Sequence, residues 1–403
     1  MTDSKTLMPR LSHMAAALPE DVLGPILAAG SDPEFISFGG GLPCPEGFPV
    51  EAIIEAGEKS LRENAFRALQ YSGPQGEIEL RRAVAEYETR DRGTPTDPDE
   101  VLITSGSQQA LDLCARVLCD KGSKILVQRP TYIGALGAFS LSEPTYVEFP
   151  ENEQGLDAEA IGAEADGARF AYVLTSFSNP TGKTLDEASR RKLVEKAREH
   201  DFWIVEDDPY GELWYHEKTP KTVRSMAPER TIRLSSFSKI LSPGMRLGYI
   251  VAPKELIQVF SKVQSDAVLS TPCINQLIAA RVMTSGLFKT HLPHIRGIYR
   301  EHAEAMLGAL EELMPKHPEI YWTRPAGGMF IWLHLPEGFD TFKMMDEAVR
   351  RKVLYIPGEF FYAQNPDKNC IRLAFVTVPK DRMRVGVERL ASLVKAELER
   401  LGK

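Results

Sequence analysis

The residue with the clearest chemical potential is Lys239, which follows a β-prone run and stands among small hydroxyl residues in the segment SSFSKILSPGMRLG. A strand-end lysine surrounded by small side chains is suited to form an imine with a carbonyl cofactor. Ser236, Ser238 and Arg246 could then grip a phosphate of that cofactor through hydroxyl donation and a forked guanidinium. The competing interpretation is a solvated loop lysine, because most lysines in proteins are exposed.

The acidic run EDDPY follows an apolar strand expected at 202–205. Asp207 could reach a ring nitrogen and keep it protonated, since a buried carboxylate without a partner would neutralise itself. Asn179, in the segment SNPTGK, could bond a phenolate oxygen. A solvated acidic turn and an Asn–Pro turn opener are the alternatives for these residues. A divalent-metal site is disfavoured, because no HxH or HxxxH cluster accompanies the acids.

A strand expected at 101–103 runs directly into the segment TSGSQQ and then a helix. Unpaired amides at the start of a helix, together with the helix dipole, form an anion site, so Gly106, Ser107 and Gln108 are candidates for binding a phosphate. A plain serine N-cap is an equally good interpretation of this motif alone. Tyr132 lies on a loop after a strand expected at 124–127, where its ring could stack on an aromatic cofactor or cap the core.

Arg372 lies within an alternating strand in the segment CIRLAFVTV. A buried arginine without a partner is costly, and its planar fork suits bidentate capture of a substrate carboxylate. A structural salt bridge is the alternative. The run Gly39–Gly41 permits close approach of the backbone to a ligand, although a plain linker would read the same way.

Strand, loop and helix alternate from about 101 to 251, which predicts a mainly parallel α/β sheet with the candidate polar residues at strand ends. Thr184 and Glu187 are expected to form a capping box that opens a long amphipathic helix. From 255 onward, amphipathic helices and short strands indicate a smaller α+β domain. We therefore expect an N-terminal arm at 1–48, a large domain at 49–286 and a small domain at 287–403.

Composition narrows the class of protein. The chain has 403 residues, 43% of them hydrophobic, a net charge of −8 and a pI near 5.7, which argues against nucleic acid or an anionic membrane as a partner. It shows neither a signal-peptide core nor an apolar run of membrane-spanning length. The five cysteines include no CxxC pair and are typical of reduced thiols in a cytoplasmic protein.

The ordered motifs YSGPQG, TSGSQQ, PTY, NPTGK, DDPY, SFSKILSPGMRLG and IRLAF resemble those of a fold-type I, class I aminotransferase that depends on pyridoxal 5'-phosphate. The resemblance covers roughly the whole chain and is nearest to the kynurenine/2-aminoadipate and aromatic aminotransferase branch. It implies a large domain whose sheet is sandwiched by helices, a smaller α+β domain, and a homodimer with shared sites.

The resemblance also assigns roles. It implies that Lys239 forms the imine, that Asp207 meets the pyridinium nitrogen, and that Arg372, backed by Gly41, holds the substrate carboxylate with Asn179 close by. Tyr71, which alone reads as a packing aromatic, would reach the phosphate in the neighbouring subunit. The remaining implied cofactor-binding residues are Gly106, Ser107, Gln108, Tyr132, Asn179, Pro209, Tyr210, Ser236, Ser238 and Arg246.

The implied reaction is a ping-pong transamination between an L-amino acid and a 2-oxo acid such as 2-oxoglutarate or pyruvate. Related 2-aminoadipate enzymes carry an N-terminal arginine for an acidic substrate side chain, but here no Lys or Arg lies between Arg10 and Lys59, and Asp21 lies about where that arginine belongs. We therefore expect a neutral aromatic or aliphatic amino donor. The alternatives are a 2-aminoadipate-type enzyme, a C–S or β-eliminating lyase on the same cofactor, and the effector domain of a transcription regulator.

Overall fold

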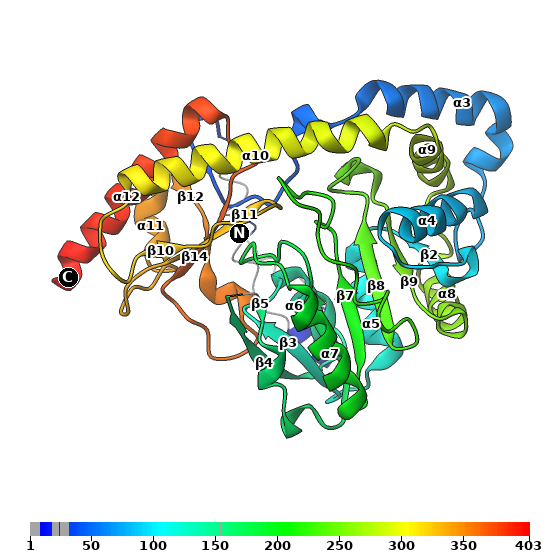
Figure 1. The fold of residues 1–403 in the computed structure, drawn as a ribbon, viewed down its shortest axis with the longest axis horizontal. Coiled ribbons are helices and arrows are strands. Elements are labelled where there is room, and N and C mark those ends of the chain that lie inside the picture. Colours follow the sequence, from blue (N-terminus) through cyan, green and yellow to red (C-terminus); the bar gives the residue numbers. More distant parts are fainter. Residues whose placement is uncertain (1–8, 18–23, 25–31, 154) are drawn as a thin grey trace, which may run out of the picture.

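The computed structural model describes residues 9–17, 24, 32–153 and 155–403 (Figure 1). Asp21, on which part of the expectation about the amino donor depends, lies outside these residues. The N-terminal part that is described contains helix α1 (His13–Ala17) and strand β1 (Ile36–Ser37).

The large sheet has eight strands within the described residues, as expected for an α/β fold. Their order across the sheet is β2 (Val101–Thr104), β9 (Gly248–Val251), β8 (Thr231–Ser236), β7 (Trp203–Asp207), β6 (Ala168–Leu174), β3 (Lys124–Arg129), β4 (Thr145–Asn152) and β5 (Gly155–Leu156). Strands β8, β7, β6, β3 and β4 pair in parallel, whereas β9 is antiparallel to both of its neighbours and β5 is antiparallel to β4. The mainly parallel sheet is confirmed.

Helices cover both faces of this sheet, because its strands are apolar on both sides. Alternate residues of β6 separate the faces: Tyr172 packs in a cluster with Leu111, whereas Val173 packs in another cluster with Leu193. The helices of this part are α3 (Val50–Leu69), α4 (Ile78–Asp91), α5 (Ser107–Leu118), α6 (Ile133–Ser140), α7 (Glu187–Glu199), α8 (Lys254–Val268) and α9 (Cys273–Thr284).

The predicted capping box at the start of α7 is wrong. Asp186 is the N-cap, and its carboxylate accepts a hydrogen bond from the Ser189 amide at 2.7 Å. The Thr184 hydroxyl instead accepts from the Phe177 amide at 3.0 Å, which ties down the loop after β6. An aspartate is an equally good N-cap, so the serine/threonine pattern pointed to the wrong residue.

The second sheet is smaller and antiparallel. Its strands lie in the order β10 (Tyr321–Trp322), β11 (Phe330–His334), β14 (Cys370–Ala374) and β13 (Ile356–Pro357). Strand β1 pairs in parallel with β12 (Val353–Leu354), so the N-terminal segment joins this part of the molecule. Its helices are α10 (Phe288–Leu313), α11 (Met345–Arg350) and α12 (Lys380–Leu401). Figure 1 shows α10 running along the top of the molecule from the end near α9 to α12.

Short 3-10 turns complete the described chain, at Pro45–Gly47, Pro98–Glu100, Ala158–Ala160, Ala163–Ala165, Pro243–Met245 and Gly358–Phe361. No helix among the described residues combines the length and the apolar character that crossing a membrane requires. The domain boundaries at 49 and 287 stay a prediction.

Candidate active site

A cavity of about 900 Å³ lies at the carboxyl ends of the central parallel strands, with β14, the 33–42 segment and the start of α12 forming its other walls. Parallel strands deliver the loops that follow them to one edge of a sheet, which is why residues distant in sequence meet here. Most of the predicted site residues line this cavity, namely Gly41, Ser107, Gln108, Tyr132, Asn179, Asp207, Pro209, Tyr210, Ser236, Ser238, Lys239, Arg246 and Arg372.

Lys239 lies just beyond the end of β8, and its side chain enters the cavity. Its Nζ donates a hydrogen bond to the Gly41 carbonyl at 3.0 Å. Burial, together with the charges of Arg372 and Arg246, lowers the pKa of Lys239 to about 8. A neutral amine is both a nucleophile and a base, so this environment makes the lysine reactive near neutral pH.

Asp207 is the last residue of β7 and is 2% exposed. The Tyr172 hydroxyl donates to its Oδ2 at 2.7 Å, while Oδ1 is buried without a partner. Burial raises the pKa of Asp207 to about 7, although the Tyr172 hydrogen bond opposes this. An orphaned carboxylate oxygen at the cavity fits a cofactor that brings a protonated ring nitrogen to it.

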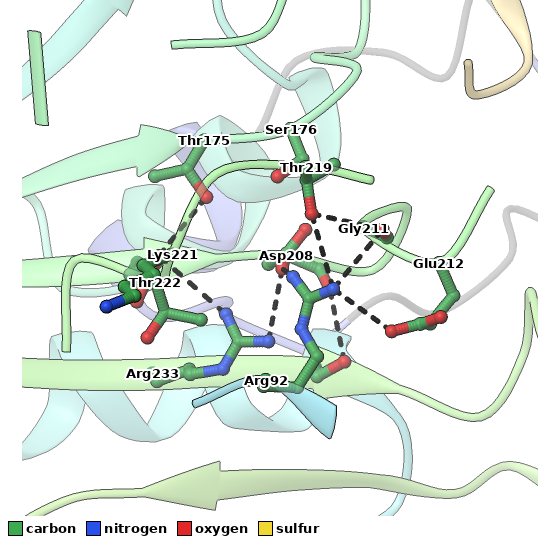
Figure 2. Close-up of polar contacts among 12 residues, drawn as sticks. Arg92, Thr175, Ser176, Asp208, Gly211, Glu212, Thr219, Lys221, Thr222 and Arg233 are labelled. Carbon is green, nitrogen blue, oxygen red and sulfur yellow. Dashed lines mark hydrogen bonds and ion pairs between the residues drawn. The ribbon is translucent and has the colours of Figure 1, made fainter. Parts of the chain in front are cut away.

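The next residue, Asp208, serves a different purpose. Figure 2 shows the guanidinium groups of Arg92 and Arg233 converging on its carboxylate, at 2.5 and 3.1 Å, and Glu212 accepting from Arg92 at 3.0 Å. Burial raises the pKa of Asp208, but the charges of Arg92 and Arg233 outweigh it and lower the pKa to about 2. The acidic run thus divides into Asp207 at the cavity and Asp208 within a buried ion-pair network.

Among the described residues there is no group of three His, Cys, Asp or Glu side chains that could hold a metal ion. The neighbouring acid Glu206 is buried as well, and it accepts from the backbone amides of Val223 and Arg224 at 2.8 and 3.1 Å. A solvated acidic turn is therefore not what the structure contains at this point.

Another part of the cavity brings Arg246 to the start of α5, and their positive charge and helix dipole suit an anion. Gly106, the N-cap of α5, has a φ of +82°, and a Cβ there would lie 2.5 Å from Arg246 Nη2, so only glycine lets the guanidinium approach the helix end. The hydroxyl of Ser236 accepts from the Ser238 amide at 3.1 Å. The Gln108 side chain is engaged elsewhere, since its Nε2 donates to the Gly134 carbonyl at 2.6 Å.

Arg372, in the middle of β14, is buried and has no carboxylate partner within the described part of the chain. Its Nη1 donates to Asn179 Oδ1 at 3.2 Å, its Nη2 donates to the Gly39 carbonyl, and its Nε has no partner. The guanidinium carbon lies 4.7 Å from the centroid of the Phe330 ring. Burial lowers the pKa of Arg372 to about 10, as expected of a cation that still lacks its anion.

The remaining predicted residues occupy different places. Tyr210 is buried with its ring edge-on to Phe330, at 5.7 Å between centroids. Tyr132 covers Gly134, where an added Cβ would lie 2.4 Å from the tyrosine Cζ. Tyr71 does not line the cavity of this single chain, and its side chain is 79% exposed.

Sequence reasoning missed Tyr172, the residue that holds Asp207. Strand β6 is almost entirely buried on both faces, so no polar–apolar alternation marked this tyrosine as different from a core residue. Its partner is 35 positions away, and only the pairing of β6 with β7 brings the two side chains together.

Replacing Tyr172 with phenylalanine is expected to weaken the retention of a pyridine cofactor about tenfold, because a charge-assisted hydrogen bond to Asp207 is lost. Cofactor affinity would be measured by absorbance titration of the stripped protein. Tyr146→Phe is the matched control, since that hydroxyl donates to the Leu136 carbonyl at 3.2 Å and does not line the cavity. Equal losses in both variants would contradict a specific role for Tyr172.

Comparison with known proteins finds relatives over most of the chain. The family described as "Aminotransferase class I and II" matches residues 34–390. The chain is 39% identical to aromatic-amino-acid aminotransferase 1 of Thermococcus litoralis, over 96% of this chain and 95% of that protein.

Solved structures show the same fold. The kynurenine aminotransferase of Pyrococcus horikoshii, in complex with PMP, is 38% identical and superposes with a TM-score of 0.92, covering 96% of this chain and 97% of that one. LysN, the alpha-aminoadipate aminotransferase of Thermus thermophilus, complexed with N-(5'-phosphopyridoxyl)-L-leucine, is 37% identical with a TM-score of 0.89, covering 96% and 98%.

Proposed function

The chain belongs to the class I and II aminotransferase family, and we propose that it transfers the amino group of a neutral aromatic or aliphatic L-amino acid to a 2-oxo acid. It is a transaminase that depends on pyridoxal 5'-phosphate. The observation that supports the proposal most is the reactive amine of Lys239, which lines one cavity together with Asp207 and the unneutralised Arg372. Similarity to whole aminotransferases does not favour a lyase or a regulator's effector domain.

When bound, pyridoxal 5'-phosphate supplies an aldehyde that condenses with amines and a protonated ring that accepts electrons from the substrate α-carbon. Asp207 Oδ1 would hold the proton on the ring nitrogen. Ser236, Ser238, Arg246 and the start of α5 would bind the phosphate, and Tyr210 and Asn179 would orient the phenolic oxygen.

The substrate is oriented by Arg372, whose forked guanidinium matches an α-carboxylate. Lys239 would be the group that takes up and returns the proton of the α-carbon, because its amine lines the cavity and is neutral at moderately alkaline pH. Arg372 is buried and Lys239 is partly buried, which would limit the access of water to the proton transfer.

The preference for a neutral donor is supported by the apolar side chains that line the cavity, namely Ile36, Leu42, Ile133, Phe361 and Val378. It is also supported by the relative named for aromatic amino acids. The test is a half-reaction screen: the pyridoxal form is mixed with single amino acids, and conversion to the pyridoxamine form is followed by absorbance. A far higher kcat/KM for 2-aminoadipate than for phenylalanine or leucine would overturn the proposal.

We propose that the working form is a homodimer in which Tyr71 reaches the partner subunit's phosphate site. Large apolar side chains are exposed beside it on α3, with Phe66 78% and Leu69 73% exposed, which is unusual unless another surface covers them. Light scattering tests this: the wild type should have the mass of a dimer, and the double variant Phe66→Glu, Leu69→Glu should be lighter. A monomeric wild type at micromolar concentration would contradict it.

We further propose a cytoplasmic location, supported by the five free cysteines, whose thiols are typical of a reducing compartment. Cell fractionation with an antibody to the chain tests this, and recovery in a secreted or membrane fraction would refute it.

A further inference from the structure

The outer end of the active-site cavity contains an arginine that none of the sequence motifs marked. Arg382 lies in the first turn of α12, is partly buried, and lines the same cavity as Lys239 and Arg372. It follows strand β14, which carries Arg372, after a short connection. The cavity thus runs between two cationic groups.

The segment 33–41 connects these groups along one wall. Its carbonyls accept hydrogen bonds in order: Pro33 and Phe35 from Arg382 Nη2, at 2.8 and 3.4 Å, then Gly39 from Arg372 and Gly41 from Lys239. The order of contacts along the segment places Arg372 between Lys239 and Arg382. Arg382 is therefore on the side of the carboxylate clamp that faces away from the reactive amine.

The charge on Arg382 is not neutralised within the described residues. Its hydrogen bonds there go only to backbone carbonyls, and it forms no ion pair. The two cations nearest to it on α12 are paired, Lys380 with Glu301 and Arg384 with Glu312. Asp32 also lines this end of the cavity, but its carboxylate accepts from the Glu34 amide at 2.9 Å and makes no ion pair with Arg382.

The contacts along this segment are compatible with a short diacid lying between the two guanidinium groups. Phe35 and Gly39 are four residues apart, so their carbonyl groups are separated by at most about 14 Å of extended chain. A five-carbon diacid held at each end by a guanidinium group needs about 13 Å between the two guanidinium carbons, from standard bond lengths and charge-assisted hydrogen-bond distances. A shorter monocarboxylic acid would leave Arg382 without an anion.

We propose that Arg382 is a specificity-determining residue, which binds the far carboxylate of a dicarboxylic 2-oxo acid while Arg372 binds the near one. This inference rests on the proposed transamination and names the class of its amino acceptor. The two substrates of a ping-pong enzyme use the cavity in turn, so a neutral donor and a dicarboxylic acceptor are compatible. The donor's apolar side chain contacts Ile36 and Leu42, and the acceptor reaches past them to Arg382.

The experiment measures binding first, with two unreactive probes on the pyridoxal form of the holoenzyme: glutarate, which has two carboxylates, and pentanoate, which has one. Arg382→Gln is expected to weaken the binding of glutarate about 10- to 100-fold and that of pentanoate less than about twofold, because only the diacid loses a charge-assisted partner. The pyridoxamine form should lose rate with 2-oxoglutarate in the same ratio, but keep its rate with 2-oxohexanoate. Asp32→Asn, which removes the opposing charge, should tighten glutarate instead.

Arg389→Gln is the matched control. Arg389 lies on the same helix and also donates to backbone carbonyls, of Glu34 and Lys352, at 3.1 and 2.9 Å, but it does not line the cavity. The inference is overturned if both arginine variants lose the same affinity for glutarate, or if Arg382→Gln does not lose more affinity for glutarate than for pentanoate. If no 2-oxo acid restores the pyridoxal form of the wild type, the proposed function itself is wrong, and this outcome differs from either of the others.

Discussion

Replacing Lys239 with alanine is expected to lower the rate of the amino-acid half-reaction by roughly 10⁴-fold, because in the proposed mechanism this side chain both attaches the cofactor and carries the proton. The variant should still fold, since within the described part of the chain the lysine makes a single hydrogen bond, to Gly41. Stopped-flow absorbance measures the rate, and borohydride reduction followed by mass spectrometry shows whether the cofactor is covalently attached.

Lys254→Ala is the control for this experiment, because that lysine is exposed, pairs with Asp99 just before β2 at 2.5 Å, and does not line the cavity. It should keep the covalent mass tag and full activity. A Lys239→Ala protein that retains either the tag or more than about 1% of the rate would remove the basis of the proposed function.

Replacing Arg372 with alanine is expected to lower kcat/KM by roughly 10²- to 10³-fold for every amino acid and every 2-oxo acid, because the α-carboxylate loses its buried partner. Arg372→Lys keeps the charge but loses the fork, so an intermediate loss is expected. This pattern differs from the one expected for Arg382→Gln, in which kcat/KM should fall only for diacids. Steady-state kinetics with one neutral and one acidic substrate of each class separates the two.

An amine without a carboxylate gives the sharpest control for Arg372. Such a substrate should react slowly in the wild type, and its rate should be the same in Arg372→Ala if the arginine acts on the carboxylate alone. If the amine is slowed as much as the amino acid, Arg372 supports the fold of the cavity, through its contacts with Asn179 and Phe330, rather than the substrate.

The sequence could predict the site because parallel strands bring their carboxyl ends to one edge. The strands expected at 101–103, 124–127, 171–174 and 202–205 correspond to strands of the large sheet. Asn179, Asp207 and Lys239 follow or end three strands that are neighbours in that sheet, β6, β7 and β8. The fold class and the strand order are therefore enough to predict that these three residues lie close together. The catalytic and binding roles assigned to them stay predictions.

The sequence could not predict contacts between residues that only the packing of distant elements brings together. Arg92 and Asp208 are 116 positions apart, and nothing local to either residue indicates that they pair. Arg382 lies in an amphipathic helix, and the pattern of that helix predicts that all of its arginines lie at the surface. Only the packing of α12 against the 33–35 segment distinguishes it from Arg384, which pairs with Glu312.

Asp207 and Asp208 are adjacent, yet one pKa is about 7 and the other about 2. For Asp208, whose folded pKa is below the usual value, the stabilising charge persists until the solution becomes strongly acidic. The cofactor-free protein therefore has a wide interval, from about pH 2 to 7, in which Asp208 is charged but Asp207 is neutral. In that interval the protein already stores the hydrogen ion that a pyridine nitrogen needs. When the cofactor binds in that interval, Asp207 itself would give the proton to the ring nitrogen. At higher pH the proton would have to come from the buffer.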